Sequence, residues 1–144
     1  MIPWWAYAVA PLVGALGALL RYALVAAGAG AQAASRATAR QRRWSSGGDE
    51  GYPFPIGVLA ANTIASLIAG VAASITAAGT TGRLLATAAF CGGLSTLSTL
   101  AVDTVSLWRA GRHTAAVVNL GVTAAAGVLA AGCGYVAVRA LSGS

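Results

Sequence analysis

The sequence predicts an all-α integral membrane protein with four transmembrane helices, and three observations lead to this prediction. The 144 residues are 58% hydrophobic and only 8% charged, with a mean hydropathy of +0.75. Soluble domains carry about 25% charged residues, so this chain cannot cover itself with polar surface. The apolar residues form four runs, each near the roughly 20 residues that a helix needs to cross a bilayer. The polar segments between them are too short for a soluble enzyme domain.

The four predicted spans cover about residues 4–27, 55–78, 83–108 and 114–139, in one membrane domain of residues 1–144. The first begins with Trp4, Trp5 and Tyr7, which are typical of a membrane interface. Its apolar run is too long for a signal peptide, and no basic segment precedes it. A loop is predicted at residues 29–52, and its Ala/Arg part can alternatively form a short interfacial helix. The other two connections are short.

The charged residues favour membrane anchoring over nucleic-acid binding. All nine basic residues are arginines, and the net charge is +6. They lie at span ends and in the long loop rather than on one face. Arg21, near the end of the first span, can extend its side chain to the interface. Cys91 and Cys133 are interpreted as small buried hydrophobic residues, and His113 as an interfacial residue.

Polar residues inside the spans are costly in lipid and therefore mark candidate functional positions. In the second span Asn62, Ser66 and Gly70 recur every four residues and share one helical face. The fourth span repeats this spacing with Asn119 and Thr123. Such residues can line a permeation path or simply join helices by hydrogen bonds. No titratable residue lies near the middle of a span, which argues against a proton-coupled antiporter.

The third span carries the pattern of a broken helix. Gly92 and Gly93 lie near its middle, and each internal glycine costs about 1 kcal/mol of helix propensity relative to alanine. Four hydroxyl residues that compete for the backbone follow at once: Ser95, Thr96, Ser98 and Thr99. We therefore predict non-helical backbone within residues 91–96, where freed carbonyls can bind a cation. The alternative is a continuous helix whose hydroxyls bond its own carbonyls.

Three motifs in order resemble the Fluc (CrcB) family of fluoride channels. The family's first-span pattern GxxGAxxRY is matched by Gly14, Gly17, Ala18, Arg21 and Tyr22. Its second-span pattern is matched by Pro55, Gly57, Leu59, Asn62, Ser66 and Gly70. Its third-span pattern FCGG[FL]TT is matched by residues 90–96, and Ser98 and Thr99 keep the serine and threonine that follow. The resemblance covers the chain except for about residues 29–52.

The resemblance implies an antiparallel dimer with two fluoride pores and a structural sodium ion, which is not transported, at the dimer centre. Backbone carbonyls at Gly92 and Ser95 would hold the sodium, and Asn62 would face the pore. The family's two pore phenylalanines correspond to Leu97 and Leu100 here. A phenyl edge carries partial positive charge and a leucine does not, so this departure weakens anion coordination by the third span. Asp103 replaces the family's glutamate, and Ala65 replaces a glycine.

The predicted function is passive, selective export of fluoride through a multi-pass protein of the inner (plasma) membrane, without catalysis. The predicted anion path comprises Asn62, Ser66, Leu97, Ser98, Thr99, Leu100, Asn119 and Thr123. The predicted partners are fluoride, membrane lipid and a second subunit, with no nucleic acid. A small multidrug-type four-span transporter is the alternative, but such a protein is expected to carry a glutamate in its first span. A non-conducting subunit is the other alternative.

The distribution of arginines bears on whether the partner is an identical chain. One side of the membrane would receive Arg21, Arg36, Arg40, Arg42, Arg43, Arg109 and Arg112, and the other only Arg83 and Arg139. Because Lys/Arg bias sets orientation, the chain is expected to insert one way, with the long loop in the cytoplasm. A single orientation cannot form an antiparallel homodimer. We therefore predict a related partner subunit of opposite bias, with an unusual homodimer as the alternative.

Overall fold

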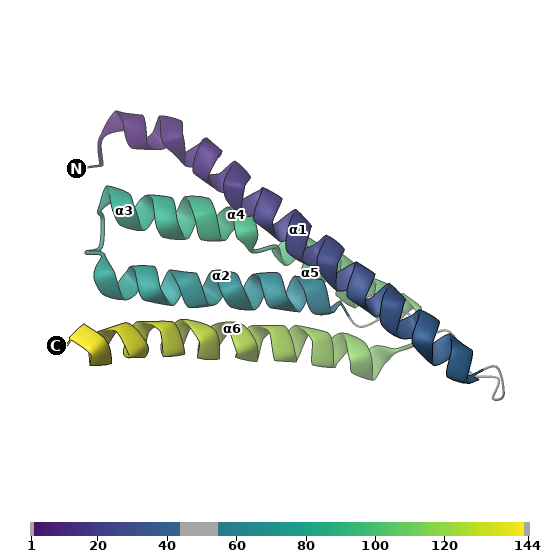
Figure 1. The fold of residues 1–144 in the computed structure, drawn as a ribbon. Helices are drawn as coiled ribbons and strands as arrows, with labels where there is room; N and C mark the ends of the chain where they lie inside the picture. Colours follow the sequence, from purple (N-terminus) through teal and green to yellow (C-terminus); the bar gives the residue numbers. More distant parts are fainter. Residues whose placement is uncertain (1, 44–54, 143–144) are drawn as a thin grey trace.

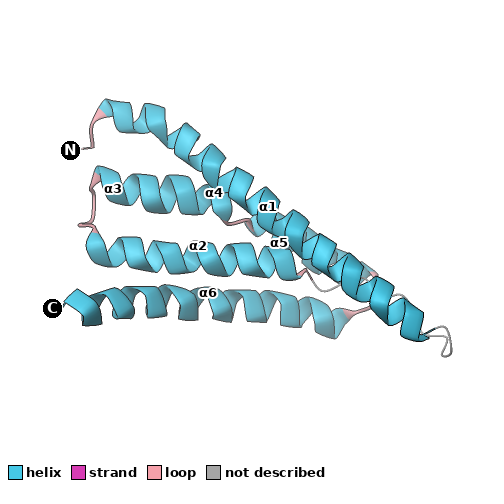
Figure 2. Cartoon of the chain, viewed as in Figure 1, coloured by secondary structure: helices cyan, strands magenta, loops and turns pink. Residues whose placement is uncertain are grey.

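The computed structural model describes the backbone of residues 2–43 and 55–142, with side chains for residues 2–30 and 55–142, and this part of the chain is helical (Figures 1 and 2). The elements are α1 (Trp4–Arg43), α2 (Ile56–Ile75), α3 (Thr81–Arg83), the π-helix η1 (Leu84–Cys91), α4 (Gly92–Leu94), α5 (Leu97–Arg109) and α6 (His113–Ser142). Four helical segments are long and apolar enough to cross a membrane: Trp4–Gly30, Ile56–Ile75, Thr81–Arg109 and His113–Ser142. This confirms the four predicted spans.

Helix α1 continues well beyond the predicted first span. It ends at Arg43, so residues 29–43 are not a loop. The Ala/Arg part is helical, as in the alternative prediction, but it continues α1 and is not a separate short helix. Residues 31–43 contain no proline or glycine and are rich in alanine, arginine and glutamine, which are strong helix formers. These residues therefore extend a helix that is already nucleated within the span. The rest of the predicted loop, residues 44–52, lies outside the described residues.

The helices alternate in direction along the bundle. The start of α1, the turn between α2 and α3 and the end of α6 lie at one end in Figure 1. The end of α1 and the turn between α5 and α6 lie at the other end. Helices α2 and α6 thus run in the same direction, and they pack side by side along their length.

Small residues bring the helix backbones into close contact. A Cβ atom added at Gly70 of α2 would lie 2.1 Å from the carbonyl oxygen of Ala131 in α6. A Cβ atom added at Gly93 of α4 would lie 2.1 Å from the carbonyl oxygen of Gly14 in α1. Such approaches are typical of helices that associate in lipid, where packing replaces the hydrophobic effect between helices.

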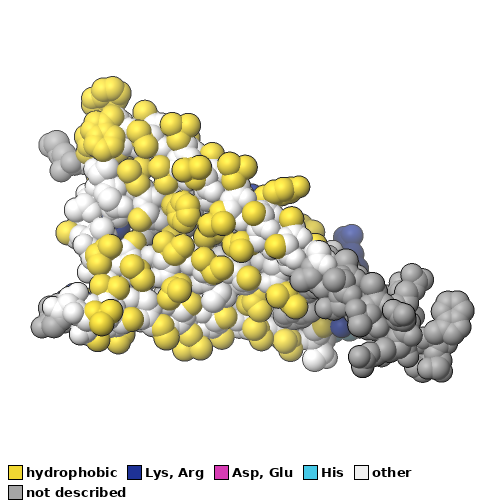
Figure 3. Space-filling view, viewed as in Figure 1, with side chains coloured by type: hydrophobic (Ala, Val, Ile, Leu, Met, Phe, Trp, Pro, Cys, Tyr) yellow, Lys and Arg dark blue, Asp and Glu magenta, His cyan; other side chains and the backbone are white. Residues whose placement is uncertain are grey.

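The surface of the bundle is apolar, as lipid contact requires. The face drawn in Figure 3 is covered largely by hydrophobic side chains. Exposed apolar residues occur on each long helix, including Leu12, Leu67, Val102 and Val128. The buried core is correspondingly small, with Ala65, Cys91 and Leu94 at its centre and Leu24 and Phe90 packed against it. The bundle is therefore built to be embedded in lipid or covered by another subunit.

Candidate functional site

The third span is interrupted in the part of the chain where the break was predicted. Helix α4 ends at Leu94, and α5 begins at Leu97. Between them Ser95 (φ −74°, ψ 150°) and Thr96 (φ −145°, ψ 102°) are extended. The glycine pair itself remains helical, so the non-helical backbone is narrower than the predicted window of residues 91–96. The prediction of a broken third span is confirmed.

Asn62 of α2 holds the break. Its Oδ1 accepts a hydrogen bond of 2.8 Å from the backbone N–H of Thr96 and one of 3.1 Å from the Ser95 hydroxyl. Asn62 is 8% exposed; its hydrogen bond to Thr96 is buried, and the one to the exposed Ser95 is partly buried. The side-chain oxygen thus satisfies an N–H group that has left the helical pattern, as buried backbone requires. Asn62 therefore joins α2 to the break by hydrogen bonds.

The hydroxyl residues after the break restart the helix. The side chain of Thr96 caps α5 by accepting a hydrogen bond of 3.1 Å from the backbone N–H of Thr99. Its Oγ1 is also 2.8 Å from the hydroxyl of Thr99 and 3.2 Å from that of Ser98. N-cap hydroxyls stabilise helix starts by about 1 kcal/mol. The Ser/Thr cluster that predicted disruption therefore also specifies where α5 begins.

Backbone carbonyls are freed on the N-terminal side of the break. Ser95 N–H bonds to the carbonyl of Cys91 at 2.8 Å, and Leu100 N–H bonds to that of Thr96 at 3.4 Å. Within the described ranges, α5 supplies no backbone hydrogen bond to the carbonyls of residues 92–95. Gly92 and Ser95, the two predicted metal-binding positions, are both exposed on the surface of the single chain. One side of the break is therefore exposed on the surface of the single chain.

Neighbouring residues of the third span face opposite directions. Thr96 and Leu100 are 4% and 5% exposed, and they pack inside the chain. Leu97, by contrast, is 76% exposed, and Ser95 and Ser98 are exposed beside it. Of the two positions that correspond to pore phenylalanines, only Leu97 thus lies on the surface of the chain. Thr99 and Arg21 are partly buried.

A column of polar residues, called the polar column below, follows the contact between α2 and α6. Ser66 lies against Gly127, where an added Cβ atom would be 3.2 Å from Ser66 Oγ, and Gly70 lies against Ala131. In both pairs, the α6 residue follows its α2 neighbour by the same number of sequence positions. The same spacing places Thr123 of α6 at the level of Asn62 of α2. The predicted polar stripes of the second and fourth spans therefore meet inside one chain, rather than only across a dimer.

Asn119 and Thr123 are buried in this column. Asn119 is 0% exposed, and its Nδ2 donates a hydrogen bond of 3.0 Å to the hydroxyl of Thr104 in α5. Thr123 is 6% exposed. Among the described residues, Asn119 Oδ1 and Thr123 Oγ1 are buried without a hydrogen-bond partner. Thr104 was not singled out in the sequence, because a hydroxyl one residue after Asp103 gives no sign that it faces another helix.

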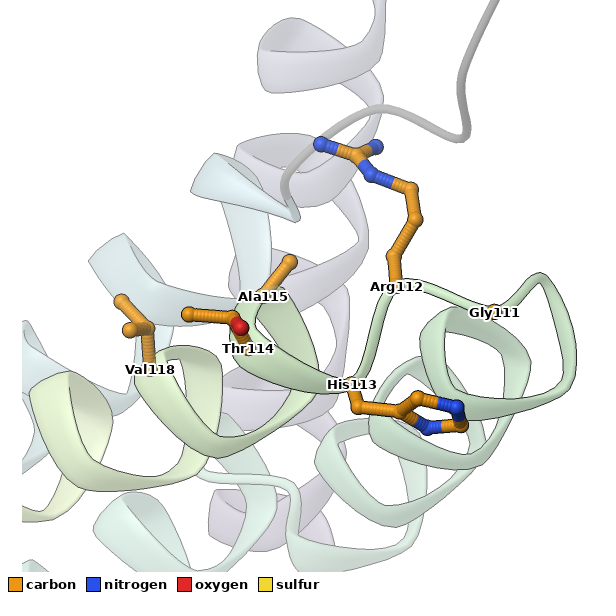
Figure 4. Close-up of a pocket in the computed structure, with 6 residues that line it drawn as sticks. All are labelled: Gly111, Arg112, His113, Thr114, Ala115 and Val118. Carbon is orange, nitrogen blue, oxygen red and sulfur yellow. The ribbon is translucent and has the colours of Figure 1, made fainter.

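One pocket lies at the turn between α5 and α6 (Figure 4), with a volume of ≈ 510 Å³. Its lining includes Arg112, His113 and Val118. Figure 4 shows the Arg112 and His113 side chains pointing to different sides of the turn. The ring of His113 packs edge-on against Trp108, with 4.3 Å between ring centroids. The two basic groups thus do not converge on one ligand.

Possible metal ligands among side chains are dispersed. The described residues contain no cluster of three or more His, Cys, Asp or Glu side chains.

Comparison with known proteins identifies similar sequences over most of the chain. Residues 8–135 match the family model described as CrcB-like protein, Camphor Resistance (CrcB). A protein of Renibacterium salmoninarum named fluoride-specific ion channel FluC is 33% identical over 126 residues, which cover 85% of this chain and 90% of that protein. Fluoride-specific ion channel FluC 1 of Thermobifida fusca is 38% identical over 124 residues, covering 86% of this chain and 88% of that protein.

Proposed function

The chain belongs to the CrcB-like family, and from this premise we infer that it is a subunit of a fluoride channel. The chain is then a multi-pass membrane protein, and it is not an enzyme. Fluoride would leave the cytoplasm passively, down its gradient, across the plasma (inner) membrane. The observation that carries this proposal is the break at Ser95 and Thr96, held by the buried Asn62. It places polar groups in the middle of an apolar span.

The anion path is proposed to follow the polar residues around this break. Asn62 uses its oxygen for Ser95 and Thr96, which leaves its Nδ2 amide as the group suited to donate to an anion. The exposed hydroxyl of Ser98 and the partly buried hydroxyls of Thr99 and Ser66 supply further donors. Asn119 and Thr123 extend the path along α6. A narrow row of such donors can replace the hydration shell of one small anion.

The open side of the break supports an antiparallel dimer. Ser95, Ser98 and Gly92 are exposed in the middle of a span, and lipid cannot hydrogen-bond to them. A second subunit can cover these groups and complete the path. An inverted copy, related by a two-fold axis in the membrane plane, would bring two such breaks together at mid-membrane. This arrangement, with an identical or a related second subunit, builds two pores from paired half-sites.

A sodium ion at the dimer centre fits the same residues. The carbonyls of residues 92–95 receive no backbone bond from α5 in the described structure, and unwound carbonyls are typical sodium ligands. Among the described residues outside its own helical turn, none lies within 4 Å of a Cβ atom added at Gly92, so an ion or a second backbone can approach there. Gly92 and Ser95 would supply these oxygens. When bound, the ion would supply positive potential near the anion path and hold the two breaks together.

The positions of the arginines favour a related but different partner subunit. The arginine-rich end of α1 and the turn after α5 lie at the same end of the bundle, opposite Arg83 and Arg139. This bias predicts a single orientation in the membrane. A partner of opposite bias could also supply aromatic residues where this chain has Leu97 on its surface. In the alternative role, this chain would support conduction through its partner without forming a complete path itself.

Fluoride efflux from reconstituted liposomes tests the proposal. The chain would be purified alone and together with related subunits from its own genome, with chloride efflux as the matched control. We expect fluoride flux from the mixed complex and none for chloride. Mapping of the termini should show one orientation for the chain expressed alone. Equal populations of both orientations, with fluoride flux from the chain alone, would show a homodimer instead.

A further inference from the structure

Helix α6 carries an unusual pair of buried polar atoms. Asn119 Oδ1 and Thr123 Oγ1 lack hydrogen-bond partners among the described residues, although both residues are almost fully buried. Buried side-chain polar atoms nearly always have a partner, so such exceptions call for an explanation. Asn119 and Thr123 lie one helical turn apart and share one face of α6. The two atoms therefore mark a polar position that the chain's own groups leave unsatisfied.

The hydrogen bond that the Asn119 side chain makes to Thr104 can run in either direction. Its Nδ2 donates to Thr104 Oγ1 at 3.0 Å. A threonine hydroxyl can also donate, and the two ends of an asparagine amide have nearly the same shape. If the amide inverts, the Thr104 hydroxyl donates to Oδ1, and the two Nδ2 hydrogens take the place of the unsatisfied oxygen. Both orientations keep the Thr104 hydrogen bond.

We propose that Thr104 is a positioning residue that lets Asn119 present either end of its amide to the polar column. With the carbonyl oxygen presented, the position accepts a hydrogen bond from water and repels an anion. With the amide nitrogen presented, Nδ2 and the Thr123 hydroxyl become two donors for one anion. The ligand class is a small anion, and the proposal rests on the proposed fluoride channel function. The Asn119 side chain would thus change from a hydrogen-bond acceptor to a donor without movement of the main chain.

Asn62 shows why this property is specific to Asn119. The oxygen of Asn62 accepts a hydrogen bond from a backbone N–H, that of Thr96, at 2.8 Å. A backbone N–H can only donate, so inversion of the Asn62 amide would set two donors against each other. The amide of Asn62 is therefore held in one orientation. That of Asn119 is held by a group that can donate or accept, so both of its orientations are satisfied at Thr104.

The test combines two variants of Thr104 in the intact channel complex. Thr104→Val keeps the shape and removes the hydroxyl, whereas Thr104→Ser keeps the hydroxyl. Loss of one hydrogen bond corresponds to roughly a tenfold effect. We expect Thr104→Val to raise the half-saturating fluoride concentration by about this factor. Thr104→Ser should remain within about twofold of wild type, and Ser106→Ala on the same helix should have no effect. Wild-type saturation in Thr104→Val, or failure of Thr104→Ser to rescue, would overturn the proposal.

A second measurement does not depend on the variants or on flux. The side-chain amide resonance of Asn119 in the wild-type complex, labelled with nitrogen-15, should shift on addition of fluoride and not of chloride. Fluoride flux with an unchanged Asn119 resonance would overturn the inference and leave the proposed function intact. A fluoride-dependent shift without flux would contradict the proposed function and support the inference.

Discussion

The two faces of the third span differ more than its sequence suggests. On one face, Gly93 and Leu100 pack against the rest of the described chain, whereas Gly92 and Leu97 on the other face are exposed. A Cβ atom at Gly93 would collide with Gly14, whereas one at Gly92 would meet no atom within 4 Å. Leu100 is 5% exposed and Leu97 is 76% exposed. The two glycines and the two leucines thus differ in their surroundings. The face with Gly93 and Leu100 packs inside the subunit, and the face with Gly92 and Leu97 is exposed.

The largest effect on the single chain is expected from Gly93→Ala. The added Cβ atom would lie 2.1 Å from the carbonyl oxygen of Gly14, and two helix backbones would have to separate. Overpacking typically costs 1–3 kcal/mol and more where the backbone must move, so we expect at least about 3 kcal/mol of lost stability. Thermal unfolding in detergent measures this effect. The matched control is Gly92→Ala, which should unfold like wild type. Equal losses in the two variants would show that the faces do not differ.

Asn62→Leu should have the next largest effect, because the buried face depends on its oxygen. The variant leaves the Thr96 N–H and the Ser95 hydroxyl without their acceptor. The Thr96 N–H is buried, and an unsatisfied buried group costs about 1–3 kcal/mol, whereas the Ser95 hydroxyl is exposed. We therefore expect a loss of roughly 1–3 kcal/mol together with the loss of fluoride flux. Asn62→Asp keeps an acceptor and removes the amide donor, and it should lose flux with a smaller loss of stability. If Asn62→Leu unfolded and conducted like wild type, Asn62 would have neither role.

The two leucines give a matched pair for the same comparison. Leu100→Phe should destabilise the chain by about 1–3 kcal/mol, because the larger ring must fit a position that is 5% exposed. Leu97→Phe should leave thermal stability within about 0.5 kcal/mol of wild type, as surface substitutions usually do. In the channel complex, Leu97→Phe should raise fluoride flux, since the ring edge favours an anion. A destabilised Leu97→Phe with a tolerated Leu100→Phe would reverse the assignment of the faces.

Gly92→Leu is expected to have the smallest effect on the single chain and a clear effect on assembly. Nothing in the described chain lies within 4 Å of the added Cβ atom, so the subunit should fold and remain thermally stable. The side chain would nevertheless occupy the space proposed for a second backbone and a sodium ion. Size-exclusion chromatography with light scattering should show monomers. A stable, fully active dimer of this variant would argue against the sodium position.

Much of the fold could be predicted from composition and local pattern. Apolar run length predicted the four spans, because lipid requires each segment to satisfy its own backbone. The Gly-Gly pair and the hydroxyl cluster predicted the break for the same local reason. The end of α1 was not predicted correctly, since an arginine-rich segment after a span can be a loop or a continued helix. Only its covalent connection to an existing helix favours the helix.

Residue type alone predicted which residues belong to the candidate site, whereas helix packing determined their orientations and hydrogen-bond partners. The sequence alone marked Asn62, Asn119 and Thr123 as polar residues at membrane depth, because their cost in lipid depends only on residue type. The sequence could not show that Asn62 accepts a hydrogen bond from the Thr96 N–H, or that Asn119 is hydrogen-bonded to Thr104. Nor could it separate Leu97 from Leu100, which occur in the same repeated pattern. Orientation around a helix and the partner of each hydrogen bond depend on the neighbouring helices, and these come together only in the tertiary structure.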